Sequence, residues 1–427
     1  MVKLQDLQVP EEVFENSLIS LHLKCMRTYG YIVSSQQRNK RLNLRKGAIF
    51  TASFAVCCCL IFIKISKGFA SLADGATSCA TAFLYLSTSI ATANAFFQRT
   101  RVVRMVTFLH EDITELLRIT DAVEEMMLSK TVKYLRIITI LMWTPSVIAG
   151  FIAYIDCFYR SVFMPETVFN IPEVLNGTAQ PILLFQLFPF GEVYDNFIVG
   201  YLGACYALFL GITAIPCWHT FVCCLMKYIV LKYAIVHKRL KEYDLAKFSQ
   251  ELNPEKLRTL SEKDLLYWHT KMCEFCVTHQ LKLRWFTGEL QSLIRIPVFS
   301  DFIIFSVLIC FLFYAIAAGN PSNMDYFFIA IYLFVMSFIL WLYHWHATLI
   351  AESNDELCMG LYSSPWHKFP ISIQKNIRLM MMESNTPLIM KAIFVELNLK
   401  TFIDVVRGAY SYFSILRNAG LESEDTN

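Results

Sequence analysis

Charged residues are scarce in this sequence. Of its 427 residues, 56% are hydrophobic and only 17% are charged, whereas soluble globular proteins are about 45–50% apolar and about 25% charged. Aromatic residues are plentiful, with 35 Phe and 20 Tyr. This composition argues against a soluble domain and predicts a polytopic membrane protein. The formal net charge of +3 is informative only once the charges are assigned to loops.

Catalytic and cofactor-binding motifs are also missing. The sequence has no Gly-rich phosphate loop, no H-E-x-x-H and no G-x-S-x-G. We therefore expect no enzyme activity, no cofactor and no metal site. Most of the 14 cysteines lie in apolar runs, which predicts buried thiols and not a disulfide framework. The C-x-x-C pair of Cys273 and Cys276 has no second pair, so an ordinary helical face explains it better than a metal or redox site.

Seven apolar segments are present. A membrane-spanning helix needs about 20 mostly apolar residues, and the last segment is the shortest and least hydrophobic of the seven. No internal repeat or low-complexity linker divides the chain. We predict one all-α membrane domain with seven transmembrane helices. The predicted spans are 48–66, 75–97, 136–158, 197–233, 299–318, 326–350 and 401–418.

The basic residues fix the predicted orientation. Lys and Arg are frequent in 1–47, in the loop between the second and third spans, and in 234–298, whereas loop 159–196 has a single basic residue, Arg160. Basic loops are cytoplasmic, so the N-terminus is predicted inside and the tail 419–427 outside. The segment 1–47 has no apolar core suited to a signal peptide, so we expect the first span to direct insertion.

A glycosylation sequon agrees with this orientation. Asn176-Gly177-Thr178 lies in the loop 159–196, which the charges already place outside. Asn176 is therefore a predicted glycosylation site.

The long cytoplasmic stretches 234–298 and 351–400 are predicted to be helical. Apolar residues recur at spacings of three and four in the first of them, which is typical of an amphipathic helix. This region could be a simple extension of the bundle. We favour an anchor platform that packs against copies of the chain or a partner. The apolar positions are Leu265, Trp268, Met272, Phe275 and Cys276.

Topology narrows the class of membrane protein. Intramembrane charges are few, which disfavours a secondary transporter. Seven spans with the N-terminus inside are inverted relative to G-protein-coupled receptors. A receptor or a channel remains, and a metabotropic seven-helix chemoreceptor that signals through a cytosolic partner is kept as the alternative. A structural or chaperone-like membrane protein is a third possibility.

The last 70 residues resemble the seven-transmembrane insect odorant receptors. Length, seven spans, inverted topology and the long inner loop agree with that family over the whole chain, and the C-terminal stretch is the specific part. The sequence differs from the family's shared co-receptor at Arg417-Asn418. The matching positions are Leu361-Tyr362, Trp366, Pro387, Phe394, Leu397, Thr401-Phe402, Val406, Ala409-Tyr410-Ser411-Tyr412-Phe413 and Leu416.

The resemblance implies a ligand-tuning subunit of an odorant-gated cation channel. In this family four subunits surround a pore lined by each final helix, and co-receptor subunits complete the assembly in the plasma membrane of olfactory neurons. Its alignment places Ile415 at a hydrophobic gate that closes by dewetting, Leu416 beside it and Asn418 at the outer mouth. The partners implied are the co-receptor, membrane lipid and a small volatile ligand, with no nucleic acid.

A volatile, apolar ligand needs an apolar pocket with few polar groups. The resemblance places this pocket in the outer half of the bundle, among the second to sixth spans. Val147, Gly150 and Tyr154 are spaced by three and then four residues, so they share one helical face, and the family has a glycine followed by an aromatic residue at matching places. The further predicted odorant-binding residues are Ala82, Tyr85, Leu86, Tyr206, Leu210, Phe311 and Tyr314.

Overall fold

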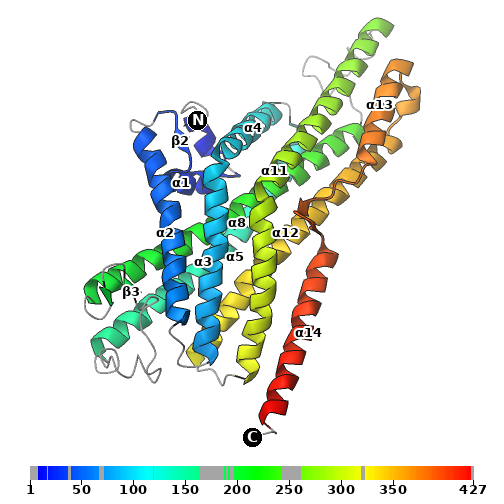
Figure 1. Ribbon diagram of the computed structural model, residues 1–427. Coiled ribbons are helices and arrows are strands. Elements are labelled where there is room, and N and C mark those ends of the chain that lie inside the picture. The colour runs from blue at the N-terminus through cyan, green and yellow to red at the C-terminus, as the bar shows by residue number, and fades with distance from the viewer. Residues whose placement is uncertain are drawn as a thin grey trace.

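Long α-helices that run side by side form the protein in the computed structural model (Figure 1). Seven of them correspond to the predicted spans. Their bounds are α2 Lys40–Ser66, α3 Leu72–Phe97, α5 Ala122–Phe163, α8 Phe197–Glu242, α11 Glu262–Ala318, α12 Asn323–Ser363 and α14 Leu399–Glu424. The structure describes residues 8–16, 18–36, 40–66, 72–118, 120–163, 187–188, 191–192, 197–242, 261–318 and 323–424.

Five of these seven helices are long and apolar enough to cross a membrane by composition alone: α2, α5, α8, α11 and α12. Helix α3 is instead rich in Ala, Ser and Thr, and it packs against α2 and α11. Small residues at such interfaces let helix backbones approach closely inside a membrane. Helix α14 also falls outside the five, because polar residues occupy one of its faces.

Helix α11 continues from the cytoplasmic region into the membrane without a break. It has 57 residues and joins most of the predicted segment 234–298 to the predicted span 299–318. Pro297 lies inside it and cannot donate a hydrogen bond to the carbonyl of Leu293. The side chain of Asn94 on α3 donates to that carbonyl at 2.7 Å. The amide thus satisfies the polar group that proline leaves free and ties α3 to α11.

The cytoplasmic stretch 351–400 is only partly helical, unlike the prediction. Helix α12 ends at Ser363, and the short helix η3 (Trp366–Lys368) and helix α13 (Ile371–Ser384) follow. Strands β5 (Lys391–Ala392) and β6 (Val395–Glu396) then form an antiparallel hairpin before α14. Pro365, Pro370 and Pro387 lie within these interruptions. Proline lacks a backbone donor and disfavours a helical conformation in the residue before it, so it prevents one continuous helix here.

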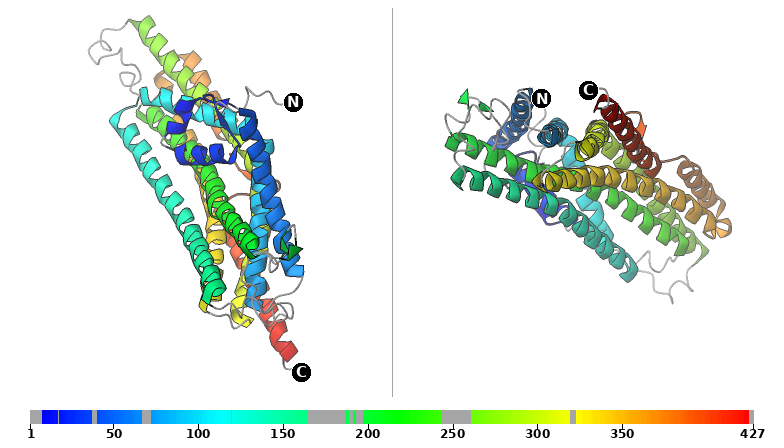
Figure 2. Two further views of the ribbon diagram at one scale, coloured as in Figure 1. Left: turned by 90° about the vertical axis from the view of Figure 1, so that its left-hand side faces the viewer. Right: turned by 90° about the horizontal axis from the view of Figure 1, so that it is seen from below.

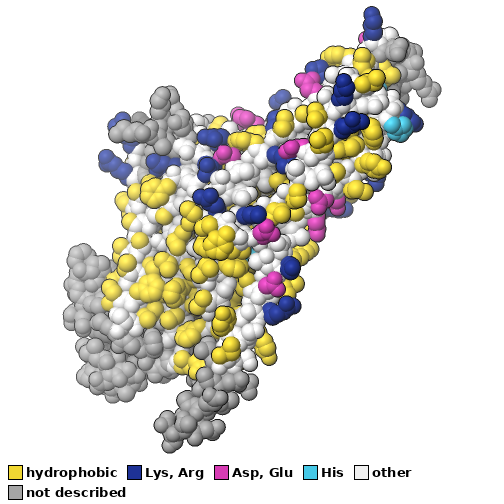
Figure 3. Space-filling model, turned by 45° about the vertical axis from the view of Figure 1, so that its right-hand side comes forward, with side chains coloured by type: hydrophobic (Ala, Val, Ile, Leu, Met, Phe, Trp, Pro, Cys, Tyr) yellow, Lys and Arg dark blue, Asp and Glu magenta, His cyan; other side chains and the backbone are white. Residues whose placement is uncertain are grey.

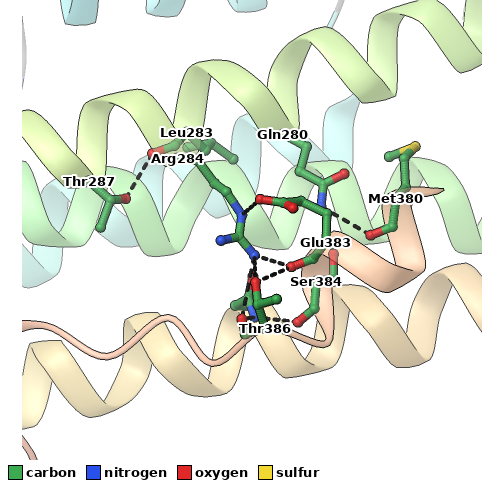
Figure 4. A network of polar contacts seen from close by, with 9 residues as sticks. Gln280, Leu283, Arg284, Thr287, Met380, Glu383, Ser384 and Thr386 are labelled. Carbon is green, nitrogen blue, oxygen red and sulfur yellow. Dashed lines mark hydrogen bonds and ion pairs between the residues drawn. The ribbon is translucent and has the colours of Figure 1, made fainter.

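The end of α13 is held by polar side chains from the neighbouring helices (Figure 4). Gln280 on α11 donates to the hydroxyl of Ser384 at 2.7 Å, and Asn354 on α12 donates to the Ser384 carbonyl at 2.7 Å. Arg284 forms an ion pair with Glu383 at 2.9 Å and donates to the hydroxyl of Thr386 at 2.7 Å. The last carbonyls of a helix lack partners within it, so these contacts fix α13 against α11 and α12.

A small N-terminal unit covers the cytoplasmic end of α2. Strand β1 (Gln8–Val9) pairs in parallel with β2 (Val33–Ser34), and helices η2 (Glu11–Glu15) and α1 (Ser20–Tyr29) lie between them. Gly30 ends α1 with a φ of 82°. A Cβ there would lie 2.2 Å from the carbonyl oxygen of Asn43, so glycine is required by both its conformation and its close contact with α2. In the loop before α8, β3 (Leu187–Phe188) pairs with β4 (Gly191–Glu192).

His22 anchors α1 to the bundle. It is buried, and its Nε2 donates to the hydroxyl oxygen of Thr220 on α8 at 2.8 Å, because that hydroxyl itself donates to the Pro216 carbonyl. The Nδ1 of His22 lies 4.0 Å from the sulfur of Cys224. Burial lowers the pKa of His22 from its usual 6.5 to about 4. The imidazole is therefore neutral in the folded protein at pH 7.

Acidification is expected to weaken the fold at His22. The unfolded chain binds a proton near pH 6.5 and the folded chain only near pH 4, so stability falls as the pH drops through this window. A shift of this size corresponds to about 2 kcal/mol lost between pH 7 and pH 5. Thermal unfolding of wild type and His22→Gln, measured at both pH values, tests this. An equal pH dependence in the two proteins would contradict it.

Helix α4 (Arg99–Arg118) joins the bundle through a buried ion pair. The Nζ of Lys232 on α8 lies 2.7 Å from Asp112 on α4, and the two side chains are only 2% and 3% exposed. The hydroxyl of Tyr228 donates to the same carboxylate at 2.6 Å. The Nε2 of His279 on α11 lies 3.9 Å from its other oxygen. One carboxylate therefore connects α4, α8 and α11.

Candidate functional site

The predicted odorant-binding residues differ in burial. The most exposed of them face away from the packed centre of the chain, so they do not line an enclosed space within it. Ala82, Tyr85, Gly150 and Leu210 are buried; Leu86, Phe311 and Tyr314 are half-buried; Val147, Tyr154 and Tyr206 are exposed.

Tyr85 is the centre of the buried group. Its hydroxyl donates to the carbonyl of Ala207 on α8 at 2.5 Å. A Cβ at Gly211 would lie 2.7 Å from that hydroxyl, so glycine leaves the room that the tyrosine occupies. The ring of Phe54 on α2 lies 5.9 Å from the Tyr85 ring. This part of α8, which includes Leu210, is thus in contact with α3 at an aromatic, apolar site that contains the Tyr85 hydroxyl.

Gly150 brings α5 against the same part of α8. A Cβ at this position would lie 2.0 Å from the Cδ1 of Ile212. The glycine therefore permits a close helix contact, in addition to the role in the pocket that the sequence predicts. Because α3 and α5 both meet α8 within residues 207–212, Tyr85 and Gly150 border one region of the bundle.

Thr81, Tyr332 and Phe54, which were not among the predicted pocket residues, also belong to this region. The hydroxyls of Thr81 on α3 and Tyr332 on α12 lie 2.6 Å apart. Together with Phe54, they extend the aromatic site to α2 and α12. A weak signal was available for Thr81, which lies one helical turn before Tyr85. Phe54 and Tyr332 are ordinary aromatic residues of apolar runs, and their sequence gives no reason to single them out.

The other predicted pocket residues outside this group are Tyr206 on α8 and Phe311 and Tyr314 on α11. Tyr206 donates through its hydroxyl to Ser53 on α2 at 3.2 Å, near the surface. Two residues after Phe311, the ring of Phe313 lies 6.2 Å from the ring of Phe413 on α14. The assignment of these residues to an odorant pocket remains a prediction.

A second polar cluster joins four helices. Ser87 on α3 donates to Asp301 on α11, while the Nδ1 of His219 on α8 and the hydroxyl of Tyr343 on α12 form a hydrogen bond of 2.7 Å. The Nδ1 of His219 lies 3.9 Å from Asp301, and all four side chains are buried. An ionisable residue inside a membrane bundle is costly and is kept where it has a partner or a function. Here the cluster around Asp301 connects α3, α8, α11 and α12, of which α3, α8 and α12 also border the Tyr85 region.

No group of three or more His, Cys, Asp or Glu side chains is placed to hold a metal ion among the residues that the structure describes. Cys273 and Cys276 are both buried in α11, and both belong to the hydrophobic core. Their place on one packed helical face agrees with the simpler interpretation of the C-x-x-C pair.

Helix α14 lies at the edge of the bundle, against α11 and α12 (Figure 2). Its packed face includes Phe402, Val405, Ala409 and Phe413, which recur at spacings of three and four. Ile415 lies on the other side and is 62% exposed. The predicted pore residues Leu416 and Asn418 belong to α14, but their side chains, like all of Asn176, lie outside the described part of the structure.

Comparisons with known proteins agree with this architecture. Residues 71–410 match the 7tm Odorant receptor family. The chain is 50% identical to Odorant receptor 56a of Drosophila melanogaster over 421 residues, which cover 99% of this chain and 100% of that protein. It is 26% identical to Odorant receptor 10 of Aedes albopictus over 133 residues, which cover 31% of this chain and 35% of that protein.

A solved structure shares the fold. The insect olfactory receptor OR5 from Machilis hrabei, in complex with eugenol, aligns with a TM-score of 0.73 and 15% identity, over 94% of this chain and 97% of that chain. The seven-helix architecture predicted from the sequence is confirmed by this likeness and by the family match. The chain belongs to the odorant receptor family and is a multi-pass membrane receptor, not an enzyme.

Proposed function

We propose that this odorant receptor is the ligand-binding subunit of an odorant-gated, non-selective cation channel that contains the shared odorant co-receptor. The ligand is a small, volatile, apolar molecule bound in the outer half of the bundle. The observation that carries the channel proposal is the composition of the exposed face of α14. A metabotropic seven-helix receptor that signals through a cytosolic partner is the alternative.

Large apolar side chains are exposed along the flanks of α14, but the narrow face opposite its packed face is unsuited to lipid. Asp404, Arg407 and Ser411 lie on it, opposite the packed face. Asp404 and Arg407 form an exposed ion pair at 3.5 Å, and a Cβ at Gly408 would meet no atom within 4 Å. Charged and polar side chains in a spanning helix face water or another protein surface, because lipid provides no partners for them. This face fits the wall of a water-filled pore between subunits.

Ile415 is the large apolar residue on the narrow face that also carries Asp404, Arg407 and Ser411. Ile415 follows Ser411 by four residues, which is about one helical turn, so the two side chains lie on the same side of α14. A ring of such apolar side chains around a narrow pore can exclude water and stop ion flow. Ile415 is therefore the proposed gate of this subunit, with Leu416 beside it and Asn418 toward the outer mouth.

Replacing Ile415 with Ala is expected to raise the basal current severalfold, because the smaller side chain widens and wets the constriction. Whole-cell current without odorant, normalised to surface protein, measures the effect. Ile403→Ala is the matched control, since Ile403 is also exposed on α14 but lies three turns away from Ile415. An unchanged leak and unchanged ion selectivity in the Ile415 variant would remove this residue from the gate.

The cytoplasmic region offers a surface for assembly. Ile371, Leu379 and Met382 on α13 and Phe394 in the β5–β6 hairpin are all exposed. Large apolar side chains exposed together outside the membrane are typical of protein interfaces. They support the anchor platform proposed for this region, in which subunits pack against each other below the membrane.

The odorant would bind where α3, α5 and α8 meet. Tyr85 lies beside Phe54 and the small residues of α8, and the hydroxyls of this region already have partners within the protein: Tyr85 bonds the Ala207 carbonyl, and Thr81 bonds Tyr332. Such a site suits an apolar ligand with few polar groups. To open the pore, the ligand must bind the open state more tightly than the closed state. Contacts from α11 to both α3 and α14 give a direct physical connection between the two places.

Recordings from excised outside-out patches without GTP test the channel proposal. The chain is expressed with and without the co-receptor and exposed to an odorant panel. Fast odorant-gated cation current that requires both chains is expected. Responses that survive only in intact cells supplied with GTP would refute the channel and favour the metabotropic receptor.

Cysteine accessibility tests the role of α14 separately. In Ser411→Cys, a positively charged thiol reagent is expected to reduce the odorant-gated current, because the new thiol lines the pore. Ala409→Cys places a thiol on the packed face and should not respond, since Ala409 is buried. Wild type measures the effect on native cysteines. A co-receptor-dependent current that is equally insensitive in both variants would keep the channel but exclude α14 as its wall.

A further inference from the structure

A basic hollow of about 430 Å³ lies where α3 and α4 meet α11. Arg101 and Arg104 line it from α4, and Arg295 lines it from α11. Gln98 and Ser292 add polar groups, and none of its lining residues is acidic. Three guanidinium groups around one hollow form a site for an anion, because each offers donors in a fork that matches phosphate oxygens.

The charges of the hollow are only partly neutralised. Glu289 forms an ion pair with Arg101 at 2.9 Å and lies 3.9 Å from Arg104. Arg101 also donates to the side chain of Gln98. The guanidinium group of Arg295 makes no hydrogen bond or ion pair with any residue that the structure describes. One carboxylate thus contacts two of the three guanidinium groups, Arg104 only at long range, which leaves Arg104 and Arg295 available for a ligand.

The rim of the hollow is apolar on one side. Phe97 is the last residue of α3 and is 80% exposed, and Ile296 directly precedes Pro297, near the predicted start of the fifth span. The space-filling view shows hydrophobic side chains over the lower part of one face and Lys and Arg side chains gathered above them (Figure 3). The predicted spans end at Phe97 and begin just after Ile296, so we infer that the hollow lies at the cytoplasmic boundary of the membrane, with its guanidinium groups toward the headgroups and its apolar side chains toward the acyl chains.

We propose that this hollow binds the phosphate headgroup of an anionic phospholipid from the cytoplasmic leaflet. Basic pockets between transmembrane helices on the cytoplasmic side are suited to such headgroups. A soluble phosphate compound would use the same guanidinium groups but would gain nothing from Phe97 and Ile296. The lipid would bridge α4 and α11 beside the Asn94–Leu293 hydrogen bond and so brace the junction of the second and fifth spans.

The test uses purified full-length receptor and dioctanoyl phosphatidic acid, a short-chain lipid with a simple phosphate headgroup. Binding is measured by the rise in unfolding temperature with lipid concentration. Dioctanoyl phosphatidylcholine and inorganic phosphate are the comparison ligands. We expect saturable stabilisation by phosphatidic acid, at least about tenfold weaker in the double variant Arg104→Gln, Arg295→Gln because two charge-assisted contacts are lost.

Arg136→Gln is the matched control. Arg136 is an exposed arginine at the predicted inner end of the third span and does not line the hollow, so this variant should bind phosphatidic acid like wild type. The conservative variant Arg104→Lys, Arg295→Lys should keep part of the affinity, which shows that the fold tolerates changes at these positions. Equal loss in Arg136→Gln, or none in the double Gln variant, would overturn the site. Equal stabilisation by inorganic phosphate would overturn the lipid as its occupant.

Discussion

Replacing Gly150 with Trp is expected to reduce odorant sensitivity by at least about tenfold, the effect of adding bulk to a small apolar site. Even a Cβ at this position would lie 2.0 Å from the Cδ1 of Ile212, so an indole must displace the α8 side chains that border Tyr85. Concentration–response curves for an odorant panel, recorded with the co-receptor and normalised to surface protein, measure the change.

Smaller substitutions separate a filled pocket from a disturbed helix contact. Gly150→Ala should be tolerated once Ile212 is shortened, so Gly150→Ala with Ile212→Val is expected to respond like wild type. Gly288→Ala on α11 is the control for adding a side chain to a helical glycine, because a Cβ there meets no atom within 4 Å. Normal responses of Gly150→Trp to every ligand, at normal surface amounts, would place the odorant site elsewhere.

Replacing Asp112 with Ala is expected to destabilise the receptor by about 3–5 kcal/mol, because it leaves Lys232 as an uncompensated buried charge. The pair is almost fully buried, with 2% and 3% exposed side chains and a separation of 2.7 Å. Tyr228 also loses the acceptor of its hydrogen bond. Unfolding of the purified receptor in detergent, followed by denaturant or heat, measures the loss.

An exposed ion pair of similar geometry provides the comparison. Lys271 and Glu274 on α11 lie 3.0 Å apart with 46% and 62% exposed side chains, so Glu274→Ala should cost less than about 1 kcal/mol. Replacing both buried partners, in Asp112→Leu with Lys232→Met, should restore most of the stability, since no buried charge remains. If Asp112→Ala were no more harmful than Glu274→Ala, the buried pair would not hold α4 to α8.

Much of the bundle could be predicted because membrane insertion depends on local sequence properties. The apolar length of each segment determines whether it can span, and the positions of Lys and Arg determine the orientation. The spans that correspond to α3 and α14 were also predicted from the sequence, although neither helix is apolar enough to be identified as a membrane span by hydropathy alone. The amphipathic pattern Leu265 to Cys276 also agrees with the structure, where Met272 and Cys276 are buried.

The candidate site was less predictable because it depends on which helices meet. Spacing along the third span placed Val147, Gly150 and Tyr154 on one face, yet only Gly150 of the three is buried. Tyr85 finds its partner 122 residues away, at the carbonyl of Ala207. Thr81 and Tyr332 are still further apart in the chain, with a separation of 251 residues. Such contacts have no local sequence signal.

The sequence by itself determined that the chain is a seven-helix membrane protein with a cytoplasmic helical region and a short last span, because these properties follow from the transfer of each segment between water and lipid. Only the tertiary structure decided which side of α14 faces away from the bundle, which carbonyl Asn94 satisfies, and that Arg101, Arg104 and Arg295 share one hollow. Those features depend on close packing between distant segments, and packing is a property of the assembled helices and not of any one of them.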